Sequence, residues 1–293
     1  MRVSDTHLEE VRTQGFTVVE GFLEPDLLRD AQSALWNIYP TPEAYFTDPA
    51  AHAKLTQHQF AGIRYFPYAD WGLNRLAVHP DLVDAAERFC GTPDLDLYKI
   101  ELWAKYSGTL SHDQAHHRDY GNHTIVVPKR DDSFVQMTTF LLLSDVTEAD
   151  GPTKVVPLSE TKDLPLHPRQ LAMDAFRDKE ISITGKAGTL FIYKTDVVHR
   201  GSALTGDKRS RFVLLVDYHP RGRPWTGKIA WPDRALSPEW HDAMARMTPR
   251  ERCLFGFPAP GDAYWDDQTV RDVGLRYPAM DMTPYATGLA HVE

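Results

Sequence analysis

The sequence predicts a mainly β protein with flanking helices, built on a jelly roll or barrel core. From residue 94 onward, runs rich in β-branched and aromatic residues follow one another, separated by turns of Gly, Pro, Asp and Ser. No regular helical pattern alternates with these runs, so a parallel α/β sheet is not expected. The expected strands span residues 96–107, 116–127, 133–146, 153–157, 181–194 and 209–219.

Helical patterns dominate the segment before the strand-rich region. Residues able to cap a helix precede the first amphipathic run, and prolines at the first helical position begin two later ones. Residues 41–75 are aromatic and irregular, which is typical of a packed surface loop or of a pocket wall. The expected elements are a helix from Ser4 or Asp5 to Gly15, a strand at 16–23, a helix from Pro25 that stops before Pro40, and a helix at 80–89.

The chain is expected to form a single domain with three parts. Its 293 residues, 42% hydrophobic and 25% charged, can bury a large core. Residues 1–93 would buttress the core with helices and the aromatic loop, and residues 94–220 would form the β core itself. Residues 221–293, rich in proline and aromatic residues, would form a cap that packs on the barrel, lines the site or makes a dimer contact.

Composition excludes several classes of partner. The net charge of -9 and the absence of a long basic cluster argue against nucleic-acid binding. No apolar run is long enough for a transmembrane helix, and the polar amino terminus lacks the pattern of a signal peptide. Cys90 and Cys253 have no metal-ligand spacing, so we expect a protein of the reducing cytoplasm that does not bind membranes.

A His-x-Asp triplet in the middle of the chain suggests a metal site. On an extended strand, His117 and Asp119 would project from the same face. With His199, at the end of GTLFIYKTDVVH, they would complete the set of two histidines and one carboxylate that binds non-haem ferrous iron. The triplet that begins at His79 has the same pattern, but its proline is typical of the first turn of a helix.

Several motifs then occur in a fixed order. Gln114 precedes the His-Arg-Asp triplet, DVTEADGPTKVVP and His-x-Gly-Ser come next, and an arginine opens a strand that ends in Tyr218. This order, over roughly residues 10 to 220, resembles the phytanoyl-CoA dioxygenase-like family. The resemblance implies a double-stranded β-helix of cupin-like type, with Fe(II) and 2-oxoglutarate as cofactors.

The resemblance also implies roles for individual residues. His117, Asp119 and His199 would ligate the iron. Arg211, Ser202 and Lys105 would contact 2-oxoglutarate, with the arginine holding its distal carboxylate through a planar fork that keeps its charge.

The register of the arginine depends on one spacing. The chain reads His-Arg-Gly-Ser from residue 199, one residue longer than the family's usual His-Gly-Ser, and counting from Ser202 leads to Arg211. Arg209 would share the strand face of Arg211 and stays as the alternative. His116 and Arg118, at odd parity in the motif, should face away from the metal, and His112 and His123 are not expected to be ligands.

Substrate contacts are expected from the aromatic loop and from beside the motif, at Arg64, Tyr65, Trp71 and Tyr120. Related halogenases have a small residue where this chain has Asp119, so the resemblance favours hydroxylation. The expected reaction hydroxylates an unactivated C–H bond of a small organic molecule, such as a secondary metabolite or a fatty-acid or amino-acid derivative. Dioxygen would be consumed, and succinate and carbon dioxide would be released.

Other functions stay open at this point. A cupin-type metal enzyme could use the same fold without 2-oxoglutarate, and a metal-free binding module could hold a small molecule on it. Nucleic-acid demethylation is disfavoured by the acidic charge. A homodimer is among the expected assemblies.

Overall fold

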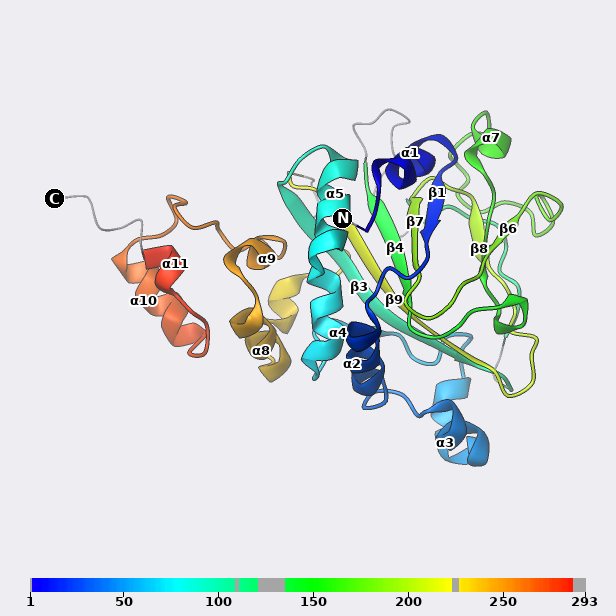
Figure 1. Cartoon of the computed structure of the whole chain (residues 1–293), viewed down its shortest axis with the longest axis horizontal. Helices are drawn as coiled ribbons and strands as arrows, with labels where there is room; N and C mark the ends of the chain where they lie inside the picture. The colour runs from blue at the N-terminus through cyan, green and yellow to red at the C-terminus, as the bar shows by residue number, and fades with distance from the viewer. Residues whose placement is uncertain (1, 109–110, 121–134, 223–226, 287–293) are drawn as a thin grey trace.

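Two antiparallel sheets face each other at the centre of the fold (Figure 1). The computed structural model describes residues 2–108, 111–120, 135–222 and 227–286. The larger sheet has the strand order β1-β7-β4-β9-β3-β2, and the smaller one has the order β6-β5-β8. The strands are β1 Phe16–Val19, β2 Arg64–Tyr65, β3 Leu95–Tyr106, β4 Met137–Leu142, β5 Thr153–Val155, β6 Ile181–Ile183, β7 Leu190–Lys194, β8 His199–Gly201 and β9 Ser210–Pro220.

Helices from the first part of the chain cover the outer face of the larger sheet, as Figure 1 shows. They pack on it through one large apolar core, which also takes in side chains from the C-terminal segment. The short helix Pro42–Thr47 lies beyond the end of the helix Pro25–Leu35, whereas the helix Trp71–Asn74 packs beside that helix. The bounds are α1 Asp5–Thr13, α2 Pro25–Leu35, α3 Pro42–Thr47, η1 Pro49–Thr56, α4 Trp71–Asn74, η2 Arg75–Val78 and α5 Pro80–Cys90.

The period of two in β9 explains how one sheet serves two cores. Leu214 and Val216 pack against the helices, whereas Val213 and Leu215 point between the two sheets. Both faces of the strand are therefore buried, which is why it reads as a continuous apolar run. The inner core contains residues from both sheets, including Val155 of β5.

Local signals set the helix starts. The Ser4 hydroxyl accepts a hydrogen bond from the backbone N–H of His7 at 3.2 Å, which caps α1. The His-Pro-Asp triplet begins α5, because the Nδ1 atom of His79 accepts from the Asp81 N–H at 3.2 Å and Pro80 occupies the first turn. The prediction of a mainly β core with flanking helices, and of a helix start at His79, is confirmed.

Several expected elements differ from those observed. The strand predicted at 116–127 is wrong where the structure describes it: His117 makes only an isolated β-bridge and Asp119 lies in a turn, while 121–127 fall outside the described residues. The run 181–194 is divided by a turn at Gly188, whose φ of +90° favours glycine. The second helix ends at Leu35 and gives way to turns before Pro40.

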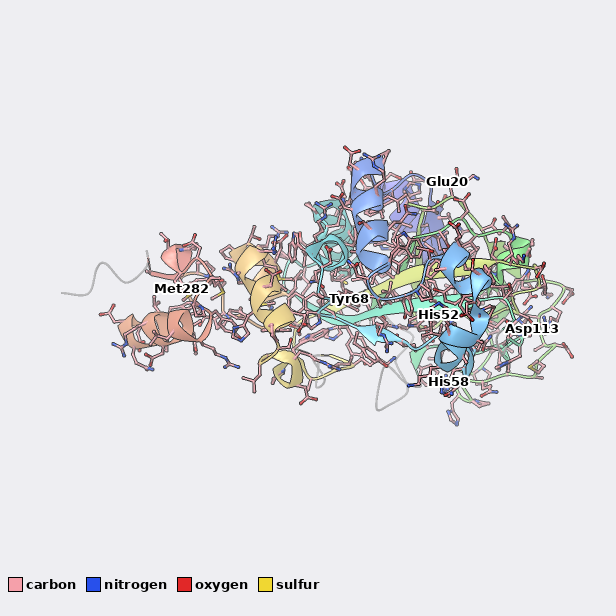
Figure 2. All side chains as sticks on the ribbon, turned by 90° about the horizontal axis from the view of Figure 1, so that it is seen from below. Glu20, His52, His58, Tyr68, Asp113 and Met282 are labelled. Atoms are coloured by element: carbon pink, nitrogen blue, oxygen red, sulfur yellow. The ribbon has the colours of Figure 1, made fainter. Side chains whose placement is uncertain are left out.

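The C-terminal segment forms a helical cap that extends away from the sheets (Figure 1). Figure 2 shows Met282, in this cap, at the opposite end of the molecule from Asp113. In the part of the chain described here, every helix is too short or too polar to cross a membrane. The smaller elements are η4 Glu148–Asp150 and α7 Leu158–Thr161, and those of the cap are η5 Trp231–Arg234, α8 Pro238–Arg246, α9 Pro249–Cys253, α10 Asp267–Arg276 and α11 Thr283–Ala286.

The packing of β9 predicts the effect of a cavity. Leu214 is fully buried, so Leu214→Ala should lower the free energy of unfolding by about 2–5 kcal/mol. Leu236→Ala is the matched control, because the side chain of Leu236 is 86% exposed, and its cost should stay below about 0.5 kcal/mol. Urea unfolding of both variants checks this, and equal costs would contradict the assigned packing.

Candidate metal centre

A pair of backbone hydrogen bonds brings the separated histidines together. The N–H of His117 donates to the carbonyl of His199 at 2.9 Å, and the N–H of His199 donates back to the carbonyl of His117 at 2.9 Å. This antiparallel bridge adds the His-x-Asp segment to the edge of the smaller sheet beside β8. Residues 82 positions apart in the chain therefore lie side by side.

Three donor atoms converge at this bridge. One ligand atom from each of His117, Asp119 and His199 lies within 4.8 Å of the others. The Asp119 carboxylate oxygens are 3.8 Å from Nε2 of His117 and 3.5 Å from Nε2 of His199. The Nδ1 atoms of the two rings lie against the carbonyls of Ala115 and Val197, at 2.9 and 3.1 Å. An Nδ1–H that donates there leaves both Nε2 lone pairs for a metal.

The donor set suits a divalent transition metal. Imidazole nitrogens and a carboxylate on one side of an ion are the ligands of non-haem ferrous sites. The Tyr193 hydroxyl donates to Oδ2 of Asp119 at 2.6 Å, which orients the carboxylate. The residues present therefore fit an iron ion. His199 of β8 would hold it together with the two ligands of the bridged segment, while β7 contributes the tyrosine that orients the carboxylate.

Burial and charge act differently on the two histidines. Burial lowers the pKa of His117 to about 4, and the nearby His199 acts in the same direction. Burial would also lower the pKa of His199, but the neighbouring Asp119 carboxylate outweighs it and raises the pKa above its usual value. A neutral His117 is the form that can bind a metal at neutral pH.

The three donors line a cavity of about 790 Å³ that opens between the sheets. Its walls combine apolar side chains with charged groups from the larger sheet, from the segments beside the triad and from the C-terminal segment. The described residues that line it beside the triad include Phe60, Ile63, Glu101, Trp103, His112, Asp113, Gln114, Phe140, Thr153, Arg169, Gln170, Met173, Gly201, Arg211 and Lys228.

A buried arginine faces this cavity. The guanidinium of Arg211, at the start of β9, donates to the carbonyl of Gly151 and has no ion-pair partner in the described residues. Burial lowers its pKa to about 10, so it stays charged at neutral pH. Gly151 has a φ of +65°, and an added Cβ would lie 2.8 Å from the carbonyl of Ser202, so glycine is required beside the arginine.

Lys105 and Ser202 lie next to this arginine. Lys105 of β3 stands opposite Arg211 in the register, and its Nζ donates to the Ser202 carbonyl at 2.9 Å. The Ser202 hydroxyl donates to the carbonyl of Pro152 at 2.7 Å. Burial lowers the pKa of Lys105 to about 6, and the Arg211 charge acts in the same direction. The structure thus brings the predicted cofactor residues together, with Arg211 lining the cavity.

The alternative arginine lies elsewhere. The side chain of Arg209 is 48% exposed and its Nε is 3.5 Å from Asp150. It precedes β9, so the expected sharing of a strand face with Arg211 is wrong.

The predicted substrate residues are not among those that line the cavity. Arg64 and Tyr65 form β2 at the outer edge of β3 and line a neighbouring hollow instead. Trp71 begins α4 and packs against the outer core. The Tyr120 hydroxyl donates to the Leu166 carbonyl at 2.9 Å. The structure thus gives these four side chains other surroundings, and nearness in the chain to the aromatic loop or to the motif does not by itself place a residue in the cavity.

Sequence reasoning missed a charged pair inside the cavity. Glu101 of β3 is fully buried, and its carboxylate accepts from Lys228 at 2.7 Å and from the Trp103 indole at 3.1 Å. Lys228 belongs to the C-terminal segment, so this segment lines the site as well as packing on the sheet. The available signal was the alternation of Lys99, Glu101, Trp103 and Lys105 with apolar residues in one strand.

The other histidines near the motif have different places. His116 is buried and its Nε2 lies 3.0 Å from Glu180, away from the triad, as the parity predicts. Arg118 donates to the carbonyls of Asp196, Pro165 and Leu166. His112 lines the cavity without joining the metal group, and His123 lies outside the described residues.

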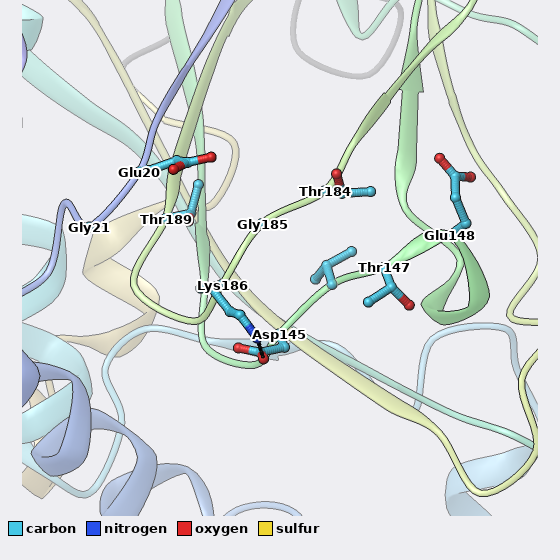
Figure 3. A pocket seen from close by; sticks show the side chains of 10 residues that line it. Glu20, Gly21, Asp145, Thr147, Glu148, Thr184, Gly185, Lys186 and Thr189 are labelled. Carbon is cyan, nitrogen blue, oxygen red and sulfur yellow. Dashed lines mark hydrogen bonds and ion pairs between the residues drawn. The ribbon is translucent and has the colours of Figure 1, made fainter.

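A second hollow, of about 540 Å³, lies at the turn before β7 (Figure 3). Glu20, Asp145 and Glu148 give it an acidic rim, but Asp145 pairs with Lys186 at 2.8 Å. Among the described residues it has no histidine or cysteine, and no group of metal ligands forms there. The triad cavity is therefore the candidate site.

Comparison with known families decides the relationship. The family model for phytanoyl-CoA dioxygenase matches residues 11–213, more than half of the chain. The chain belongs to the phytanoyl-CoA dioxygenase family. The prediction from the order of motifs is therefore confirmed. No curated protein sequence matches the chain.

Solved structures show the same fold. The carbocyclase SnoK, from nogalamycin biosynthesis, has 18% identity and a TM-score of 0.57 over 80% of this chain and 92% of its own. The epimerase SnoN, from the same biosynthesis, has 18% identity and a TM-score of 0.53, covering 74% and 82%. Both are described as non-haem enzymes that depend on α-ketoglutarate. This compound is also called 2-oxoglutarate. Iron-bound HygX from Streptomyces hygroscopicus has 15% identity and a TM-score of 0.55, covering 76% and 88%. The likeness confirms the jelly-roll, cupin-like fold expected of the family.

The geometry of the triad predicts the metal dependence of two variants. His199→Ala should weaken binding of ferrous iron by at least about a hundredfold, since a direct ligand matters more than an outer partner. His79→Ala removes the other His-x-Asp histidine and should keep the affinity of the parent chain. Anaerobic calorimetric titration with iron measures both. Equal affinities in the two variants would contradict the assignment.

The buried lysine predicts how stability depends on pH. Lys105 has a pKa of about 6 in the folded chain and 10.5 in its ordinary state, so between these values the unfolded chain binds a proton that the folded chain does not. The free energy of unfolding should therefore rise with pH in this window, and fall as pH drops toward 6. In Lys105→Met this rise should be smaller. Urea unfolding of the metal-free protein from about pH 6 to about pH 10 checks the difference.

Proposed function

We propose that this protein is an Fe(II)- and 2-oxoglutarate-dependent dioxygenase that hydroxylates an unactivated C–H bond of a small organic molecule. Membership of the phytanoyl-CoA dioxygenase family supports the cofactors. SnoN has been solved with Fe3+ and α-ketoglutarate, and HygX with nickel and 2-oxoglutarate, which agrees with the cofactors expected from the sequence.

The observation that carries the proposal is the place of Arg211 relative to the triad. A buried guanidinium without a carboxylate partner among the described residues shares one cavity with His117, Asp119 and His199. Burying an unpaired charge is costly, so the chain gains by binding an anion there. A dicarboxylate that reaches from a metal on the triad to Arg211 satisfies both ends.

The residues around the cofactor have separate tasks. When bound, iron and 2-oxoglutarate supply the oxidising chemistry that uses dioxygen and releases succinate and carbon dioxide. Tyr193 holds the Asp119 carboxylate through its hydroxyl, and Arg211 fixes the far end of the dicarboxylate. Trp103 and Phe140 line the cavity with apolar surface that restricts water around the reacting C–H bond.

Hydroxylation is favoured over halogenation by Asp119. The resemblance implies a small residue at this position in halogenases, whereas here Asp119 supplies a carboxylate that the Tyr193 hydroxyl would keep in place. The structurally similar SnoN is an epimerase and SnoK is a carbocyclase. Epimerisation or ring closure is therefore the alternative to hydroxylation. Once a substrate is found, the mass and structure of its product distinguish these reactions.

The two other functions considered from the sequence have less support. A cupin-type enzyme without 2-oxoglutarate gives the buried charge of Arg211 no carboxylate to bind. A metal-free binding module gives the three converging donor atoms of the triad no ion to hold. The proposed partners are a small-molecule substrate and dioxygen. A homodimer is the proposed assembly. Cys90 and Cys253 are both free thiols, which supports the cytoplasm as the proposed location.

Arginine variants test the proposal directly. Arg211→Gln should raise the dissociation constant of 2-oxoglutarate by about tenfold to hundredfold, because a charge-assisted pair contributes about 1.5–3 kcal/mol. Arg209→Gln is the matched control and should bind 2-oxoglutarate as the parent chain does, since this side chain is half exposed. Calorimetric titration of the iron-loaded protein gives both constants.

The release of succinate is measured for the same proteins. The parent chain should convert 2-oxoglutarate to succinate slowly without substrate, and only with iron and dioxygen present. If Arg209→Gln lost affinity for 2-oxoglutarate and Arg211→Gln did not, the assignment of Arg211 as the cofactor arginine would be wrong. Iron binding with no 2-oxoglutarate binding at all would favour the cupin-type enzyme.

A further inference from the structure

A second arginine in the cavity has no assigned partner. Arg169 lines the wall on the side of His117, and its side chain is half-buried. No hydrogen bond or ion pair reaches its guanidinium from the described part of the chain. Since burial of an unpaired guanidinium is unfavourable, this group is suited to an anion that enters the cavity.

The segment that carries Arg169 is fixed to the metal site. The N–H of Arg118 donates to the Arg169 carbonyl at 2.9 Å, and the N–H of Leu171 donates to the His116 carbonyl at 2.8 Å. Between these bonds, His117 and Gln170 form a β-bridge. The backbone of Arg169 is thus held in register with an iron ligand, as a substrate-binding residue requires.

The odd-parity residues of the motif anchor the same segment from behind. The buried Arg118 guanidinium donates to the carbonyls of Pro165 and Leu166 at 3.1 and 3.2 Å. The Tyr120 hydroxyl donates to the Leu166 carbonyl at 2.9 Å. The motif therefore supplies metal ligands from alternate positions and a rigid support for Arg169 from the positions between them.

The charges that line the described part of the cavity leave Arg169 in excess. Glu101 is paired with Lys228 at 2.7 Å. Asp113 is paired with Arg200 and Arg177, at 2.8 and 2.9 Å. Asp119, the remaining carboxylate, belongs to the triad, and Arg211 is itself a cation, so neither of these offsets the charge of Arg169.

The remaining described walls combine uncharged polar side chains, among them Gln114, Thr153 and Gln170, with apolar ones. Phe60, Trp103, Phe140 and Met173 line the same cavity, and Met173 is 45% exposed at its edge. These surfaces suit a hydrocarbon or aromatic body and provide no further charge. A ligand that fits these walls and Arg169 would have an apolar body and one anionic end.

We propose that the substrate is a carboxylic acid with an apolar body, and that Arg169 binds its carboxylate and so positions the C–H bond beside the metal. This inference rests on the proposed function, because it assumes iron and 2-oxoglutarate in the rest of the cavity. Arg169 is a specificity-determining residue on this account, separate from the arginine that holds 2-oxoglutarate.

The test uses matched pairs of acids and amides. The full chain, loaded anaerobically with iron and saturating 2-oxoglutarate, is titrated calorimetrically with phenylpropionate, indoleacetate and decanoate, and with the primary amide of each. At least one acid should bind about tenfold to hundredfold more tightly than its amide. Arg169→Gln should abolish this preference and leave the affinity for 2-oxoglutarate unchanged. Arg271→Gln, with a side chain 65% exposed on α10, is the control and should keep the preference.

Each contrary result has a distinct meaning. Absence of a preference for any acid in the parent chain, or a preference that survives in Arg169→Gln, overturns the inference. A loss of 2-oxoglutarate affinity in Arg169→Gln as large as in Arg211→Gln also overturns it, since the arginine would then serve the cofactor. If the parent chain forms no complex with iron and 2-oxoglutarate, the proposed function itself fails.

Discussion

The antiparallel bridge between His117 and His199 joins two segments on which every other feature of the site depends. Its reciprocal hydrogen bonds extend the smaller sheet by one segment and set the spacing of the two imidazoles. Asp119 then comes within reach through a turn, and the carbonyls next to each ring fix which nitrogen faces inward. A metal site assembled by backbone pairing is rigid before any ion binds, which lowers the free-energy cost of ordering the ligands.

The larger sheet supplies the rest of the site through the alternation of its strands. The outer face of β3 and β9 packs on the helices, while the inner face presents Glu101, Lys105 and Arg211 to the space between the sheets. At the other end of the same face, Lys99 and Asp217 form a buried ion pair 3.2 Å apart. Burying this much charge reduces the stability of the fold. Such groups are found where they bind a cofactor or orient one another.

The order of the helices and strands, and the residues of the triad, could be predicted from the sequence because their signals are local or belong to a motif. Prolines and capping residues mark the helix starts, and apolar runs mark the strands of both sheets. The spacing from Ser202 indicates Arg211, and this arginine lines the cavity. The side chains of Glu101, Arg169 and Lys228 could not be placed by such signals, because their positions depend on contacts between distant segments.

The substrate residues show the same limit. Arg64 and Tyr65 stand in an aromatic segment that suggested a pocket wall, but edge pairing with β3 directs this segment to a neighbouring hollow. Tyr120 follows the metal motif in sequence, yet its hydroxyl supports the segment behind Arg169. Nearness in the chain to a motif predicts a shared element and not a shared cavity.

The most direct test of this account is anaerobic titration of the metal-free protein with ferrous iron and 2-oxoglutarate, followed by visible absorption spectroscopy. Iron and 2-oxoglutarate bound together at the triad should give a weak charge-transfer band that requires both components and disappears in His117→Ala. A chain that binds iron at the triad and yields no such band would contradict it.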